Sequence, residues 1–275
     1  MQDKGITPHP LQSLPAEKRP SISSIAYAYA YILIPLALTI GVIIVLHLLG
    51  ETFDGSKERN LNLIANGLIQ TLARLSIAYV AALCVAIPLA LMVDSSPLAT
   101  KICLPIYDTL QSIPYLIFLP VIVLVFTQVG FLQGATVVLL FLGMLWALVF
   151  NLITGLRVVP TEIKNAGHVF GARKFKFFWN VTLPAVTPYL ITGSLLAWGA
   201  GWNLVIVAEV LHTYLPSTVA VKDVLGIGNV LVTSETTGNS FMFVSALFTI
   251  ISIVVIMNFF VWQKLLSYAE RFRFE

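Results

Sequence analysis

Six long apolar segments constrain the fold of this chain more than any other feature. A segment of roughly 20 apolar residues is long enough to cross the hydrocarbon core of a bilayer as a helix. Backbone groups inside lipid must be paired within the protein, and a helix pairs them within one segment. The sequence predicts transmembrane helices near 25–49, 68–93, 105–128, 134–156, 187–211 and 241–265. The predicted fold class is therefore an all-α polytopic membrane protein with about six spans.

Charge content supports the same class and excludes others. Charged residues make up 11% of the chain, whereas soluble domains carry about 25%. The net charge is only +3, and the positive residues lie in loops rather than on one basic face. Nucleic acid is therefore not an expected partner. The lipid bilayer is the expected surrounding of the chain. The two cysteines and four histidines show no metal-ligand spacing, so no metal site is predicted.

Two regions of different composition divide the chain. Residues 1–24 are polar and contain four prolines, which predicts a flexible tail. Residues 25–275 form one predicted membrane domain without an internal repeat. Prolines within the apolar segments, at positions 35, 88, 114 and 120, predict kinks in the helices.

The distribution of basic residues predicts the orientation. Twelve Lys and Arg residues fall in the tail, the 94–104 and 157–186 loops and the C-terminus, whereas the opposite side holds Lys57, Arg59 and Lys222. Loops rich in Lys and Arg stay in the cytoplasm. Both termini are predicted to be cytoplasmic, and 157–186 is then the longest cytoplasmic loop.

Several kinds of chemistry are missing from the sequence. It contains no phosphate-binding G-x-x-x-x-G-K-[ST] motif and no nucleophile elbow. Only Arg74 and Glu209 are charged residues clearly inside predicted spans, and Asp108 lies near the end of one, which gives little support for a proton relay. The chain is not expected to be an enzyme or to bind a cofactor. If it transports a solute, the energy is expected to come from another subunit.

The cytoplasmic loop contains a two-faced segment, "GARKFKFFWNVTLP" at 171–184. A helix over 172–182 would place its aromatic residues mostly on one face and its basic residues on the other. Gly171 separates this helix from one before it, and Pro184 is predicted to end the helical run. The helix either lies on the anionic inner leaflet or docks on a cytoplasmic partner.

The spacing within this loop resembles the "EAA" loop of ABC-importer permeases. Nine residues separate Gly171 from Val181, and Leu183 and Pro184 follow. In that family a Glu-Ala-Ala triplet precedes the glycine. Here the corresponding positions 165–167 hold Asn, Ala and Gly, and the nearest acid is Glu162.

Five further segments resemble the permeases for nitrate, taurine, alkanesulfonates and bicarbonate. They occur in the family's order: "TLARLSIAYVAALCVAIPLALMV" (71–93), "LQSIPYLIFLPVIVL" (110–124), "NLITGLRVVP" (151–160), "WGAGWNLVIVAEVL" (198–211) and "GIGNVL" (226–231). Each segment is a weak signal alone, but six motifs in order identify the chain as similar to this subfamily.

The resemblance implies a type I ABC-importer (MetI-like) permease fold in the cytoplasmic, or inner, membrane. In that family two permeases, either two copies of one chain or two related chains, face each other. Each loop docks on an ATPase that uses ATP and Mg²⁺, and an external binding protein delivers the solute. The candidate residues for ATPase coupling are Glu162, Asn165, Ala166, Gly171, Phe175, Phe178, Trp179, Leu183 and Pro184.

Polar and aromatic residues in the spans suggest a translocation path or gate. The candidates are Arg74, Asn151, Trp198, Trp202, Asn203 and Glu209. Arg74 and Glu209 are predicted at similar depth in the outer half of the membrane, so we expect an ion pair within or across permease copies. Alternatively, Arg74 binds an anionic solute directly, and Asn151 and Asn203 supply neutral hydrogen-bond donors. For Asn151, a structural hydrogen bond to backbone is the other expectation. A separate stripe of Gly193, Ala197 and Gly201 predicts close helix packing.

These observations favour the permease subunit of an ABC importer for a small solute, expected to be an oxyanion such as a sulfonate, nitrate or bicarbonate. A membrane scaffold that recruits a soluble partner through the basic-aromatic loop is the first alternative. A secondary transporter is the second.

Overall fold

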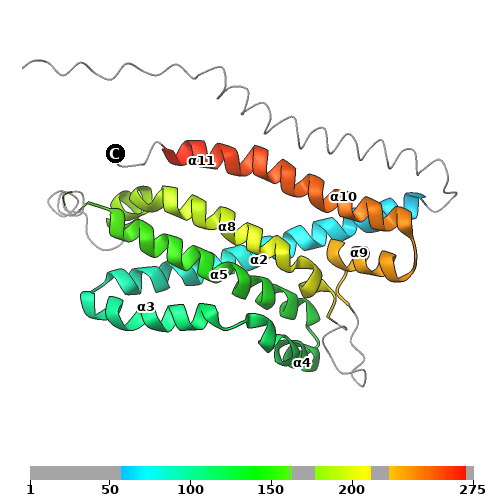
Figure 1. Cartoon of the computed structure of the whole chain (residues 1–275), viewed down its shortest axis with the longest axis horizontal. Helices are drawn as coiled ribbons and strands as arrows, with labels where there is room; N and C mark the ends of the chain where they lie inside the picture. Colours follow the sequence, from blue (N-terminus) through cyan, green and yellow to red (C-terminus); the bar gives the residue numbers. More distant parts are fainter. Residues whose placement is uncertain (1–56, 161, 163–176, 212–222, 271–275) are drawn as a thin grey trace, which may run out of the picture. The chain divides into compact units, whose positions relative to one another are not determined.

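The computed structural model describes residues 57–160, 162, 177–211 and 223–270, and every regular element within these ranges is helical (Figure 1). The α-helices are α2 Lys57–Asp94, α3 Pro97–Ser112, α4 Leu119–Val129, α5 Leu132–Val158, α8 Leu183–Glu209, α9 Ile227–Thr236, α10 Ser240–Met257 and α11 Gln263–Ala269. Three shorter turns accompany them: the 3₁₀ turn η1 Tyr115–Phe118 and the π-helical turns η2 Phe178–Thr182 and η4 Asn258–Trp262.

Four of the six predicted spans are confirmed as helices long and apolar enough to cross a membrane. They are Asn60–Asp94, Leu132–Val158, Asn180–Glu209 and Ser240–Ala269. The predicted first span (25–49) and the tail (1–24) lie outside the described residues.

The predicted third span (105–128) is not a single helix. Its residues belong to two helical segments, Pro97–Ser112 and Tyr115–Val129, which meet at a bend of 69°. The break follows from Pro114, which disfavours helical backbone at the residue before it. Ile113 accordingly has extended dihedral angles, with φ −75° and ψ 122°.

The predicted stop at Pro184 is also wrong. The π-helical turn η2 continues directly into α8, and Pro184 lies in the first turn of that helix. The wide turn pairs the N–H of Leu183 with the carbonyl of Phe178. Pro184 follows Leu183 and has no N–H group, so no backbone donor is left without a partner at this position. Proline is also well tolerated in the first turn of a helix.

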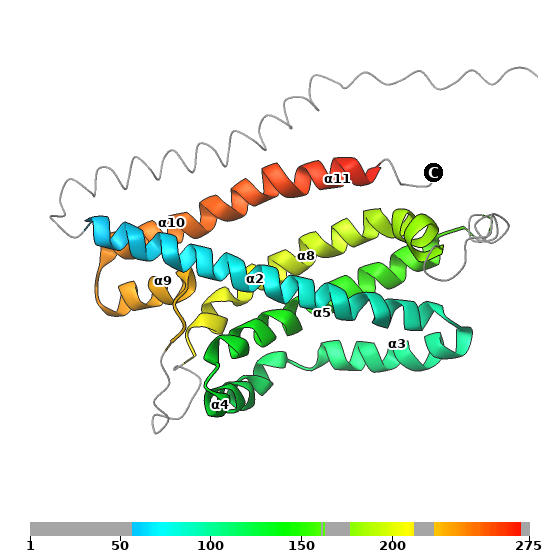
Figure 2. The same cartoon turned by 180° about the vertical axis from the view of Figure 1, so that it is seen from behind.

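Helices α2, α5 and α8 form the centre of the bundle, and both views show them side by side (Figures 1 and 2). Small residues allow this close approach. Helix α2 buries an alanine at every fourth position, each at most 1% exposed: Ala78, Ala82, Ala86 and Ala90. Helix α8 contributes the predicted stripe, in which Gly193, Ala197 and Gly201 are all buried.

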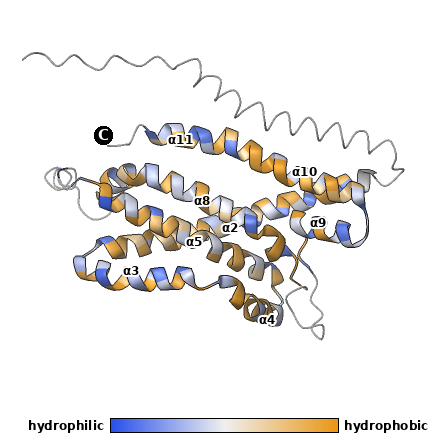
Figure 3. Cartoon of the chain, in the orientation of Figure 1, coloured by the Kyte–Doolittle hydropathy of each residue, from blue (hydrophilic) through white to orange (hydrophobic). Residues whose placement is uncertain are grey.

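The outward surfaces of the bundle remain apolar. Figure 3 shows apolar colouring over α4 and α10. Large apolar side chains such as Ile69, Val121 and Phe260 are between 61% and 65% exposed. A chain that exposes so much apolar surface needs lipid or further protein around it.

Substitution of Gly193 tests the packing of α5 against α8. A Cβ at Gly193 would lie 2.8 Å from the Cβ of Asn151 and 3.3 Å from the carbonyl oxygen of Ala147. We expect Gly193→Val to lower the free energy of unfolding by about 1–3 kcal/mol, because overpacking forces α5 and α8 apart. Denaturant unfolding in detergent measures the change.

Gly199→Val is the matched control on the same helix. A Cβ at Gly199 has no neighbouring heavy atom within 4 Å, so we expect a change of about 1 kcal/mol or less. Equal losses in the two variants would show that the stripe does not set the distance between the helices.

Candidate functional site

A buried ion pair joins the second predicted span to the fifth. Nη2 of Arg74 on α2 lies 2.6 Å from Oε1 of Glu209, the last residue of α8, and the two side chains are 4% and 1% exposed. Buried charges of this kind are stable only when they are paired and hydrogen-bonded. The predicted pairing of Arg74 with Glu209 is therefore present, within a single chain.

The Glu209 carboxylate accepts two further hydrogen bonds, which attach α9 to the pair. The hydroxyl of Thr71 donates to Oε1 at 2.6 Å, and the backbone N–H of Gly228 donates to Oε2 at 2.8 Å. Gly228 lies in the first turn of α9, where N–H groups have no partner within the helix and favour an anion. We call Thr71, Arg74, Glu209 and Gly228 the Arg74–Glu209 latch.

Additional hydrogen bonds hold the approach to α9 against the latch. Arg74 Nη2 donates to the carbonyl of Leu225 at 2.8 Å, and the N–H of Ile227 donates to the Thr71 hydroxyl at 3.0 Å. The N–H of Val224 donates to the carbonyl of Glu209 at 3.3 Å. The latch therefore fixes α2, α8 and α9 at one point.

Glycines make this convergence sterically possible. A Cβ at Gly226 would overlap the Glu209 carboxylate. At Gly228 it would lie 2.9 Å from the Cα of Ile206, and at Gly67 it would lie 3.0 Å from the carbonyl carbon of Gly226. The "GIG" segment is thus a place where backbone approaches a buried side chain closely.

The guanidinium of Arg74 is only partly satisfied. Its Nε and Nη1 atoms are buried and have no hydrogen-bond partner in the part of the chain that the structure describes. A guanidinium carries five N–H donors, and here Nη2 alone makes the hydrogen bonds, to Glu209 and Leu225. The burial of Arg74 therefore depends strongly on Glu209, its counterion in the described ranges.

Sequence reasoning found the two charges but missed Thr71 and the two N-terminal amides of α9. Thr71 precedes Arg74 by three residues, so the two side chains lie on the same face of a helix. This spacing could have indicated that Thr71 belongs to the site. The backbone donors had no side-chain signal, although "GIG" marked a special backbone segment.

The other predicted path residues have partners of their own. The ring of Trp198 is buried, with its centroid 5.9 Å from that of Tyr79 and 6.4 Å from that of Trp262. Asn151 donates to the backbone carbonyl of Ala147 at 2.8 Å, which is the structural alternative expected for it. Trp202 is half-buried and Asn203 is exposed. The candidates therefore form separate sites along the bundle.

Most of the predicted coupling loop lies outside the described residues, including Asn165, Ala166, Gly171 and Phe175. Glu162 is exposed, and Phe178 is half-buried in η2, which also contains the backbone of Trp179. Leu183 and Pro184 are half-buried at the start of α8. Their role in coupling stays a prediction.

Membrane-length helices around a buried polar latch define a multi-pass helical membrane protein. Residues 82–268 match the family described as binding-protein-dependent transport system inner membrane component. The chain belongs to this family and is a permease of the type I ABC-importer class.

Curated relatives agree with the predicted subfamily. The nitrate import permease protein NrtB of Synechocystis sp. is 27% identical over 165 residues, which are 60% of this chain and 58% of that protein. The bicarbonate transport system permease protein CmpB of the same organism is 27% identical over 52% of this chain and 50% of its own length. The taurine transport system permease protein TauC of Escherichia coli is 27% identical over 52% of this chain and 51% of its own length. The chain thus covers little more than half of these relatives.

A solved structure shares the fold. The crystal structure of an amino acid ABC transporter with histidines superposes with a TM-score of 0.55 over 78% of this chain and 96% of that chain. The sequence identity of 17% limits this likeness to the fold.

Proposed function

We propose that this chain is the membrane permease subunit of an ATP-driven importer and forms the translocation path for a small oxyanion. The observation that carries the proposal is its similarity to permeases named for nitrate, bicarbonate and taurine. These solutes differ in size, but each presents an anionic oxygen-bearing group.

The proposed assembly contains a second permease copy, ATPase subunits and an extracytoplasmic solute-binding protein. ATP and Mg²⁺ are used by the ATPase, and this chain binds neither. Both termini and the loop that contains Gly171 face the cytoplasm, and a sixth span precedes α2. The family supports this arrangement, because its members are components of binding-protein-dependent transport systems.

We assign the Arg74–Glu209 latch to the outer end of the path. It joins α8 to α9 through one carboxylate, so a change at Glu209 alters the position of α9 directly. Opening toward the outside would then accompany the breaking of these bonds, and closing would restore them. Such a two-state contact is what a gate requires.

Reconstitution tests the proposed function. The chain, purified with an ATPase and a solute-binding protein from the same organism, is placed in liposomes and supplied with labelled nitrate, bicarbonate or taurine. We expect ATP-dependent accumulation of one of these anions and stimulation of ATP hydrolysis by the loaded binding protein. Failure to copurify with an ATPase, or uptake of cations alone, would overturn the proposal.

Gly171→Pro tests the coupling loop in the same system. A proline at the predicted turn between two short helices restricts the backbone there, so we expect ATP-driven uptake to fall to background while the spans stay folded. Size-exclusion chromatography checks folding, and copurification checks assembly. If assembly and uptake both survive, the loop does not couple through this glycine.

A further inference from the structure

The exposed residues of α8 form a single row along the helix. Between Ala185 and Glu209 five residues are exposed, and they are separated alternately by four and three positions. This spacing places all five on one face of the helix. We call them the exposed row: Thr192, Leu196, Gly199, Asn203 and Ile206.

The described helices surround the rest of α8 but leave this row uncovered. Helices α2, α5, α9 and α11 all contact α8. Leu196, at the midpoint of the helix, is nevertheless 52% exposed, and a Cβ at Gly199 would have no heavy atom within 4 Å. Lipid, water or another protein chain must therefore lie against the exposed row.

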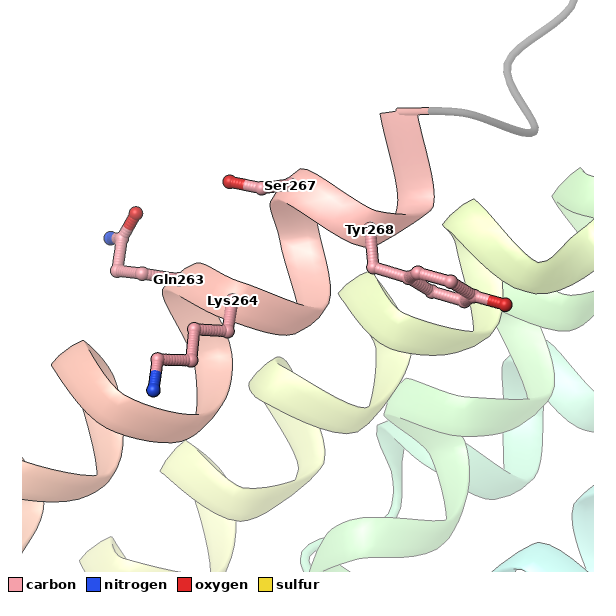
Figure 4. Close-up of a pocket in the computed structure, with 4 residues that line it drawn as sticks. All are labelled: Gln263, Lys264, Ser267 and Tyr268. Atoms are coloured by element: carbon pink, nitrogen blue, oxygen red, sulfur yellow. The ribbon is translucent and has the colours of Figure 1, made fainter.

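The composition of the row differs from that of a face in lipid. The exposed residues of α10 after Ser240 are all aliphatic: Leu247, Ile251, Val254 and Ile256. Exposed polar side chains of this span begin again at Gln263 and continue along α11 (Figure 4). Gln263 lies roughly 34 Å along the helix from Ser240, beyond a hydrocarbon core of about 30 Å. The exposed row of α8, in contrast, places a polar amide within an apolar run.

Asn203 is the polar residue of the row that has no structural role. The hydroxyl of Thr192 donates to the carbonyl of Pro188 at 3.0 Å, whereas the amide of Asn203 makes no hydrogen bond to another described residue. The apolar sequence continues from Asn203 to Leu211, a distance of roughly 12 Å along a helix. An unpaired amide at this depth is costly in lipid, so the row faces a polar surrounding.

Arg74 is not available to an anion in the same way. Its side chain is 4% exposed, and its Nη2 already donates to Glu209 and to the carbonyl of Leu225. The residues from Leu183 to Ala208 are all uncharged, so the exposed row is neutral. A transport path must bind its solute weakly enough to release it, and neutral donors meet this requirement better than a fixed cation.

We propose that the exposed row lines the water-filled translocation path and that the Asn203 amide donates a hydrogen bond to the transported oxyanion. The inference rests on the proposed function, from which it takes the class of solute. A carboxamide carries two N–H donors, and hydrogen bonds to an anionic oxygen are stronger than neutral ones. Gly199, one turn away on the same face, leaves room for the solute beside this amide.

Thiol labelling tests whether the row faces water. Cys84 and Cys103 are replaced by alanine, and single cysteines are introduced as Leu196→Cys, Asn203→Cys and Ile251→Cys. The complex in liposomes receives the membrane-impermeant anion methanethiosulfonate ethylsulfonate on both sides, with and without ATP. We expect the two α8 cysteines to react at least about tenfold faster than the α10 cysteine, because a thiol in apolar surroundings has a raised pKa and forms little thiolate.

Ile251→Cys is the matched control for Leu196→Cys. Ile251 is 41% exposed and Leu196 52%, and both lie far from the ends of their spans. Leu196 is 13 residues from either end of α8, roughly 20 Å along the helix. An impermeant reagent therefore reaches it through a water-filled path. No reaction at Leu196→Cys and Asn203→Cys, or an equal reaction at Ile251→Cys, would overturn the proposal.

Two substitutions of Asn203 test the contact with the solute. Asn203→Asp is nearly isosteric but replaces the donors by a negative charge, so we expect ATP-driven anion uptake to fall by more than about tenfold. Asn203→Gln keeps the donors and should retain measurable uptake. Copurification with the ATPase checks that both variants assemble. Uptake by Asn203→Asp at the rate of the unaltered chain would overturn the assigned hydrogen bond.

The two experiments separate this inference from the proposed function. If the unaltered complex accumulates an anion but the α8 cysteines do not react, the exposed row is not the path and the proposed function stands. If the complex accumulates no anion, the proposed function fails and the contact between Asn203 and an oxyanion fails with it. The labelling requires no solute, so it still decides whether the row faces water.

Discussion

Glu209→Ala is expected to lower the free energy of unfolding by about 3–5 kcal/mol, the usual result when one partner of a buried ion pair is removed. The substitution leaves the Arg74 guanidinium buried, with Nε and Nη1 already lacking partners in the described structure. Among the described residues, only the carbonyl of Leu225 would remain as an acceptor for Arg74. Thr71 and Gly228 would also lose their acceptor. Denaturant unfolding in detergent measures the loss, and ATP-driven uptake should fall with it.

Arg74→Ala should cost less than Glu209→Ala. The carboxylate that remains keeps two neutral donors, the Thr71 hydroxyl and the Gly228 N–H. Hydrogen bonds to a charged acceptor are stronger than neutral ones, so these donors offset part of the loss. This order of the two single variants is specific to the observed geometry and does not follow from the presence of an ion pair alone.

The double variant Arg74→Ala with Glu209→Ala provides the thermodynamic control. It removes both charges, so it should be less destabilised than the sum of the single variants by more than about 1 kcal/mol. Additive losses in stability and transport would show that the two residues act independently. The assignment of the latch as one unit would then be wrong.

Gly226→Ala is the second substitution expected to have a large effect. The backbone of Gly226 is extended, with φ −169° and ψ 170°, so alanine can adopt its conformation. The effect is therefore steric, because a Cβ would overlap the Glu209 carboxylate. Displacement of that carboxylate breaks hydrogen bonds to a buried charge, and we expect a loss of at least about 3 kcal/mol. Unfolding and uptake assays measure the two consequences.

Gly199→Ala is the comparison for this glycine. It lies within α8, and a Cβ there has no heavy atom within 4 Å. Alanine is about 1 kcal/mol more favourable than glycine in a helix interior, so stability should be unchanged or slightly raised. If Gly226→Ala behaves in the same way, the close approach of α9 to Glu209 is not required.

Much of the architecture was predictable because membrane helices follow from local composition. The segments at 132–158 and 240–269 contain enough apolar residues that lipid fixes them as helices. The bend near Pro114 also has a local cause, since proline restricts the residue before it. The π-helical turns had no such signal. The turn before Pro184 allowed a helix to continue where the sequence predicted its end.

The Arg74–Glu209 latch was also only partly predictable from the sequence. A pairing of the two charges was predictable, because an unpaired charge inside an apolar span is costly. Their pairing spans 135 positions of sequence, but similar depth was enough to suggest it. The donors from Thr71 and Gly228, and the need for no side chain at Gly226, were not accessible in this way.

The sequence by itself determined that this chain lies in a membrane as helices, that it resembles a type I ABC-importer permease, and that Arg74 and Glu209 need a partner. The first and third conclusions rest on the cost of unpaired backbone groups and unpaired charges in lipid. The second rests on motifs and their spacing. Only the tertiary structure decided that the N-terminus of α9 meets the Glu209 carboxylate and that Trp262 packs on Trp198. These features depend on distances of a few ångströms between elements far apart in the chain, and no local pattern of residues specifies such distances.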